Sequence, residues 1–122
     1  MVYINILATV VIALIALLHV YILVLEMLLW DKPAGLRVFG HTREQAAASK
    51  VLAANQGLYN GFLAAGLFWG LYLGAAGAAI NIFFLSCILL AGLYGGLTAK
   101  RKILFIQALP AAIGLALLLV QQ

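Results

Sequence analysis

One uninterrupted hydrophobic run extends from Val2 to Trp30, and the only side chains in it that ionise at or below neutral pH are His19 and Glu26. A helix needs about 20 apolar residues to cross the hydrocarbon core of a bilayer, so this run is long enough to span it. Spacings of three and four place His19 and Glu26 on the same face of that helix. A charged residue inside a span costs about 3 kcal/mol on insertion scales, which makes Glu26 a candidate functional residue.

The composition of the whole chain agrees with a membrane location. The 122 residues are 67% hydrophobic and 8% charged, whereas a soluble domain is about half apolar and about a quarter charged. A soluble fold of this size cannot bury so much apolar surface. We therefore expect an integral protein of the inner cell membrane. The first run lacks a basic n-region and is too long for a signal peptide, so we expect it to be retained.

The sequence predicts an all-α fold, a single membrane-embedded four-helix bundle. The expected spans are 2–30, 46–73, 78–98 and 103–120. Residues 33–41 are interpreted as a short polar connection and 74–77 as a tight turn. Thr42 and Gln45 have the spacing of a capping box, which predicts that the second helix begins in the cytoplasm, ahead of its span. Pro110 predicts a kink in the last span.

The basic residues predict the orientation. All seven Lys and Arg residues lie in the first connection, at the start of the second helix, or in the third connection. The positive-inside rule makes this side cytoplasmic, with both termini outside. The net charge of +4 is therefore explained by topology, and we expect no nucleic-acid partner.

Glycines spaced by four occur in the second and third predicted spans, as Gly57 with Gly61 and Gly92 with Gly96. Such pairs let helix backbones approach closely. We expect them to pack helices within one subunit, and a role in a homo-oligomer, either a dimer or a trimer, stays open.

Polar residues of different spans lie at matched depths when positions are counted inward from the cytoplasmic ends at about 1.5 Å per residue. Glu26 is expected within one side-chain length of Asn55 or Gln56, and His19 is expected to face Asn60 or Tyr59. The expected ligand-binding residues are His19, Glu26, Asn55, Gln56, Tyr59, Asn60, Tyr94 and Gln107. Together they predict a polar pocket open to the cytoplasm, holding a small amphiphilic or lipid-like ligand.

Three functions are compatible with such a pocket. An enzyme would use His19 or Tyr59 near the reacting atom, with Asn55 and Asn60 orienting the substrate. A transporter would use Glu26 as a proton-coupled site. A non-catalytic assembly partner would use the amides only for bonds between helices. The sequence offers no cluster with metal-ligand spacing and identifies no cofactor. His41, in the first connection, is expected to be solvated.

Four segments of the chain resemble one known family. They are His19 to Trp30, Lys32-Pro33, Val38 to Gly40 and Val51 to Ala65. The family comprises small, mostly bacterial four-span membrane proteins, catalogued as domain of unknown function 1304. The resemblance covers nearly the whole length, and the block NQGLYNG at 55–61 is specific to it. It implies a four-span fold and implies no activity.

Two functional families are more distantly similar. The membrane glutathione and eicosanoid enzymes also have four spans, with a basic first connection and an Asn-bearing second helix, as at Lys50 and Asn55. That similarity implies a glutathione-like thiol bound between the subunits of a trimer, but the family's Glu-Arg pattern is missing here. Small multidrug exporters are similar in length, in span number and in a glutamate in the first span. Their other motifs are absent, and the charge bias opposes a dual-topology dimer.

Overall fold

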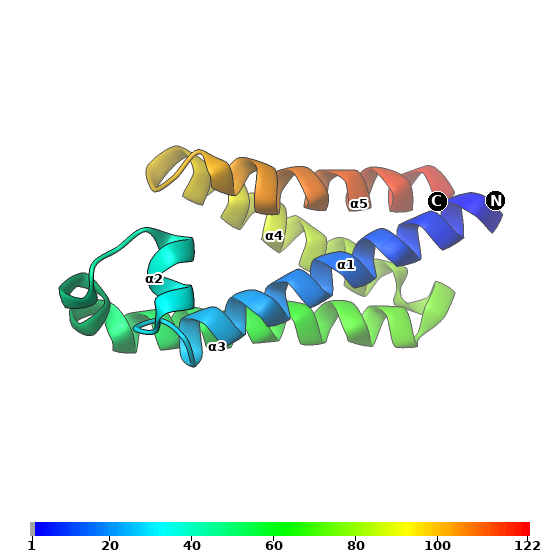
Figure 1. Cartoon of the computed structure of the whole chain (residues 1–122). Coiled ribbons are helices and arrows are strands. Elements are labelled where there is room, and N and C mark those ends of the chain that lie inside the picture. The colour runs from blue at the N-terminus through cyan, green and yellow to red at the C-terminus, as the bar shows by residue number, and fades with distance from the viewer. Residues whose placement is uncertain (1) are drawn as a thin grey trace. The chain divides into compact units, whose positions relative to one another are not determined.

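The computed structural model describes residues 2–122, with side chains from Ile6 onward. Within these residues it contains five α-helices and no strand, so the predicted all-α class is confirmed (Figure 1). The elements are α1 (Val2–Met27), α2 (Pro33–Phe39), α3 (Arg43–Tyr72), a 3₁₀ turn (Gly74–Gly77), α4 (Ala78–Thr98), a π-helical turn (Leu104–Ala108) and α5 (Leu109–Gln121).

Among the described residues, three helical segments are long and apolar enough to cross a membrane. They are Ile6–Met27, Gly74–Thr98 and Leu104–Gln121. These segments indicate a membrane protein. Helix α3 has 30 residues, more than a span requires, but its composition is more polar, so the fourth span stays a prediction.

The first connection contains a helix where the sequence was interpreted as a polar connection without one. Pro33 begins α2 in its first turn, where the missing N–H of proline removes no helical hydrogen bond. Gly40 ends α2 with a φ of 66°, and its N–H donates to the Leu36 carbonyl. A left-handed glycine of this kind is a common helix terminator. The bend back to α1 is tight, because a Cβ on Gly35 would collide with the carbonyl oxygen of Leu29.

The predicted capping box is confirmed at the start of α3. The backbone N–H of Thr42 donates to Gln45 Oε1 at 2.9 Å, and the backbone N–H of Gln45 donates to Thr42 Oγ1 at 3.1 Å. These bonds satisfy two donors that a helix start leaves without backbone partners. The second long helix therefore begins at Arg43, as predicted.

The chain divides into two compact units, each described here by itself. One unit comprises residues 17–64, and the other comprises residues 1–16 with 65–122. We call the first the α2 unit, because it contains α2 with the second half of α1 and most of α3. We call the second the α4–α5 unit, because it contains both of those helices with the start of α1 and the end of α3.

Glycines set the close packing of the α4–α5 unit. A Cβ on Gly92 would collide with the backbone of Ala108, and a Cβ on Gly96 would collide with the side chain of Leu104. Both contacts join α4 to the π-helical turn, and this turn ends immediately before the first turn of α5, which contains Pro110. A π turn is one of the recognised ways in which a helix accommodates a break in its hydrogen-bond ladder. The irregularity expected at Pro110 lies in this turn.

Candidate functional site

The candidate site is centred on Glu26, in the last turn of α1. Its side chain is 7% exposed, and its Oε1 accepts a hydrogen bond of 2.7 Å from Asn60 Nδ2 on α3. Among the described residues, Asn60 is the only group that donates to this carboxylate. Because a carboxylate offers about four acceptor positions, most of them have no donor among the described residues.

Two glycines bring α3 close enough for this bond. A Cβ on Gly57 would collide with Met27 and approach Glu26, and a Cβ on Gly61 would collide with Leu23. Asn60 lies between these glycines on the same face of α3. Small residues let two helices approach closely, so this pair of glycines packs within a single chain.

The hydrogen-bond partner of Glu26 is Asn60, which was expected to face His19. Asn55 and Gln56 were expected within one side-chain length of Glu26; both are exposed, and their proximity to Glu26 stays a prediction. Asn55 Nδ2 instead donates to the Val51 carbonyl of its own helix at 2.8 Å. The structure places Asn60 against the carboxylate, deeper along α3 by about one helical turn.

Which residue of α3 meets Glu26 depends on the position of α3 along α1. The prediction treated Trp30 and Lys50 as lying at one depth. In the structure the long side chain of Lys50 reaches Asp31, and its Nζ forms an ion pair with Oδ2 at 3.0 Å. Leu23 lies against Gly57 and Gly61, so α3 is displaced along α1 relative to the assumed register.

The remaining predicted residues are found in several places. His19 is fully buried on α1. Tyr59 is 60% exposed on α3, with its ring centroid 6.0 Å from that of Phe62. Tyr94, exposed on α4, and Gln107, half-buried in the π-helical turn, belong to the α4–α5 unit. The structure therefore brings Glu26 and Asn60 together, and the proximity of Tyr94 and Gln107 to them stays a prediction.

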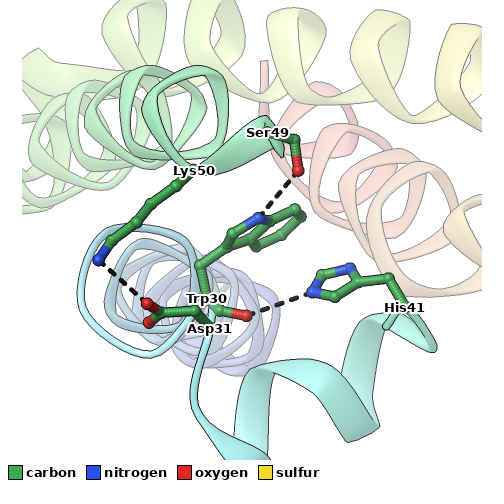
Figure 2. A network of polar contacts seen from close by, with 5 residues as sticks. All are labelled: Trp30, Asp31, His41, Ser49 and Lys50. Carbon is green, nitrogen blue, oxygen red and sulfur yellow. Dashed lines mark hydrogen bonds and ion pairs between the residues drawn. The ribbon is translucent and has the colours of Figure 1, made fainter. Parts of the chain in front are cut away.

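A polar network ties the end of α1 to the start of α3 next to the site (Figure 2). Trp30 Nε1 donates to Ser49 Oγ at 3.1 Å, and His41 Nε2 lies 3.2 Å from the Trp30 carbonyl oxygen. Asp31 and Lys50 complete the network, and the hydrogen bond from Lys50 holds the pKa of Asp31 below its usual range. The network and the Glu26–Asn60 bond therefore join the same two segments of the chain.

His41 was expected to be solvated, and the structure corrects that expectation. It is half-buried, with its ring centroid 4.4 Å from that of Trp30. Its ring also lies parallel to that of Phe39, at a centroid distance of 5.9 Å. The cause is α2, which turns the chain back so that His41 returns to Trp30. A connection without a helix would have left this histidine in solvent.

Sequence reasoning missed one polar residue, Asn81 on α4. It is 3% exposed, and its Oδ1 is buried without a hydrogen-bond partner. Asn81 could have been identified as an amide inside an otherwise apolar span, because such amides ordinarily form hydrogen bonds between helices.

The chemistry available at the Glu26 site is hydrogen bonding and proton exchange. Among the described residues, no three His, Cys, Asp or Glu side chains come together in a metal-binding group. Glu26 supplies an acceptor or, when protonated, a donor, and Asn60 fixes one of its oxygens. The arrangement suits recognition of a group that carries hydroxyl or amine hydrogens.

Comparison with known proteins places the chain in a family. Residues 13–119 match the family model described as "Protein of unknown function (DUF1304)". The uncharacterized protein YpaA of Lactococcus lactis subsp. lactis (strain IL1403) is 36% identical over 107 residues, covering 86% of this chain and 86% of the relative. No solved structure matches. The matched range includes both Glu26 and Asn60, and the chain belongs to the DUF1304 family of proteins of unknown function.

Proposed function

We propose that this protein crosses the cell membrane four times and binds a small amphiphilic molecule at Glu26, through a head group that donates hydrogen bonds. The observation that carries the proposal is the buried Glu26 carboxylate, to which Asn60 is the only donor among the described residues. A carboxylate in an apolar span is costly unless its lone pairs are satisfied. A hydroxyl or amine group of a ligand would donate the further hydrogen bonds that the Glu26 carboxylate can accept.

The charge distribution supports α3 as the fourth span. If α3 did not cross, the basic residues before it and those after α4 would lie on opposite sides of the membrane. If α3 crosses, all seven lie on one side: Lys32, Arg37, Arg43, Lys50, Lys100, Arg101 and Lys102. The positive-inside rule favours the second arrangement, with both termini outside. At about 1.5 Å per residue, α3 is long enough to cross and still begin in the cytoplasm.

This orientation is tested by single cysteines in a Cys87→Ser background. Ala47→Cys and Ala99→Cys are expected to react with a membrane-impermeant maleimide in inverted vesicles and to stay unlabelled in intact cells. Ala76→Cys, in the 3₁₀ turn, is expected to show the opposite pattern. All three alanines are exposed, so the substitutions are mild. Labelling of Ala47→Cys or Ala99→Cys in intact cells contradicts the four-span arrangement.

In the proposed orientation the ligand reaches Glu26 from the cytoplasmic side. Glu26 precedes Trp30 by about one helical turn, and Trp30 belongs to the network that joins α1 to the start of α3 (Figure 2). The apolar part of an amphiphile would then lie along the spans, while its head group meets Glu26 near the cytoplasmic interface.

The binding proposal is tested with Glu26→Gln. The Gln side chain has the same shape, and its carbonyl oxygen still accepts from Asn60, so we expect the free energy of unfolding to change by less than about 1 kcal/mol. The charge-assisted bond to the ligand is lost. Because such bonds contribute about 1.5–3 kcal/mol, ligand affinity should fall at least about tenfold.

The measurement is native mass spectrometry of the protein extracted from its own membrane in mild detergent. We expect the parent to carry a bound amphiphile that Glu26→Gln largely loses. Ser86→Ala is the control, because among the described residues Ser86 Oγ bonds only to the Ile82 carbonyl of its own helix, at 2.7 Å. If the parent and Glu26→Gln carry the same adducts and melt alike, the Glu26–Asn60 bond only joins helices, as in an assembly partner.

A further inference from the structure

The α4–α5 unit contains a cleft of about 530 Å³. The start of α1, the end of α3, the start of α4 and the end of α5 form its walls. Its polar lining comes from Thr9, Asn81, Gln121 and Gln122. Sites for small molecules usually measure about 300–1,000 Å³, so the cleft has the size of a ligand site. It does not involve Glu26 or Asn60.

Asn81 is the most informative residue of this cleft. Its side chain is 3% exposed, and its Oδ1 is buried without a hydrogen-bond partner. An unsatisfied buried acceptor costs about 1–3 kcal/mol, and native structures contain few of them, so each calls for an explanation. A molecule that enters the cleft and donates to this amide provides one.

The neighbouring helix α3 leaves space for the side-chain amide of Asn81. Asn81 Oδ1 lies against Gly70 of α3, where any Cβ would collide with it. The absence of a side chain at Gly70 therefore makes the space that the amide occupies. The torsion about the Cβ–Cγ bond of asparagine is broad and roughly two-fold. A half-turn about that bond would exchange the positions of the amide oxygen and the amide nitrogen, and with them the group that lies against Gly70.

The chemistry of the lining selects the class of ligand. Among the described residues, the cleft is lined by amides, one hydroxyl and apolar side chains such as Ile12, Leu71 and Leu118, and by no charged side chain. Because no cationic side chain lines the cleft, an anionic group buried here would lack a counter-charge, which is far more costly than burying a neutral polar group. The end of α5 presents its amides in defined positions, because Gln122 Nε2 donates to the Leu118 carbonyl at 3.3 Å.

We propose that this cleft binds an uncharged amphiphile whose hydroxyl groups hydrogen-bond to Asn81. The shared chemistry is that of a glycerol head group, which is available both as a free polyol and as the head of a neutral lipid. In either source the hydroxyl hydrogen is donated to Asn81 Oδ1, and the apolar wall contacts the carbon chain or backbone of the ligand.

The test is the thermal melting of the full-length protein in detergent, with 1-monoolein, glycerol or dodecyl phosphate as the probe. Monoolein is expected to raise the melting temperature by about 5 °C or more when present in excess. Dodecyl phosphate is expected to have no such effect. A shift with monoolein alone assigns the site to a lipid head group, and an equal shift with glycerol assigns it to free polyols.

Asn81→Leu distinguishes a role of Asn81 in ligand binding from a purely structural role. Leucine has nearly the same shape and removes the unpaired amide, so the variant should melt at the parent temperature or above it without a probe. The monoolein shift should disappear, while Ser86→Ala should retain it. Ala78→Leu, which adds bulk inside the cleft, should also lose the shift and serves if Asn81→Leu does not fold. A shift that survives in these variants, or no shift in the parent with either neutral probe because the cleft holds only water, overturns the proposal.

Discussion

Asn60→Leu is expected to lower the free energy of unfolding by about 3 kcal/mol. The substitution removes the amide that donates to the buried Glu26 carboxylate at 2.7 Å, and an uncompensated buried charge is costly. Asn55→Leu is the matched control on the same helix. Its amide is exposed and bonds to Val51 of its own helix, so its loss should cost less than about 0.5 kcal/mol. Denaturation in mixed micelles measures both values.

The double variant Glu26→Leu with Asn60→Leu completes the comparison. Replacing both partners of a buried hydrogen bond by apolar groups of similar shape is nearly neutral. We therefore expect the double variant to recover most of the free energy of unfolding that Asn60→Leu loses. The cycle should give a coupling energy of about 2 kcal/mol. Equal and small effects of Asn60→Leu and Asn55→Leu would show that Glu26 is not held as a buried pair.

Gly77→Ala is expected to destabilise the α4–α5 unit by about 3 kcal/mol. A Cβ at this position would collide with the carbonyl oxygen, carbonyl carbon and Cα of Gly70. These are backbone atoms, so the clash cannot be relieved by a side-chain rotation, and the end of α3 must move away from the start of α4. Overpacking of this kind costs about 1–3 kcal/mol, and more where the backbone must shift.

Gly95→Ala on α4 is the control for Gly77→Ala. Its Cβ would meet only side-chain atoms, Ile103 Cγ2 at 3.3 Å and Cδ1 at 3.4 Å, and no backbone. Alanine in a helix interior is also favoured over glycine by about 0.5–1 kcal/mol. Thermal melting should therefore show little change, or a gain, for this variant. If Gly77→Ala melts like the parent, the close approach of α3 and α4 at Gly70 does not exist.

The long helices were predictable because each follows from an apolar run with visible end signals. The third run was expected at 78–98, and α4 has these bounds. The capping box at Thr42 gave the start of α3. Helix α2 was missed because its seven residues carry no apolar periodicity, although Pro33 and Gly40 are the residues that commonly begin and end a helix.

Glu26 and Asn60 were both among the predicted site residues, but their pairing was not predicted. Glu26 and Asn60 were chosen because polar residues inside spans are costly and therefore functional candidates. Their pairing depends on the register between α1 and α3, which residue counting does not reveal. The environment of Asn81 also depends on packing, since its unpartnered oxygen lies against Gly70 of another helix.

A high-resolution experimental map of the protein, extracted from its own membrane, tests the proposed ligand site most directly. The account predicts an elongated non-protein density that ends within about 3 Å of the Glu26 carboxylate, at hydrogen-bond distance. Asn60 should still donate to Oε1 in that map, as it does here. A carboxylate closed off by apolar side chains or by further protein donors, with no density beside it, would contradict the proposal that Glu26 binds an amphiphile.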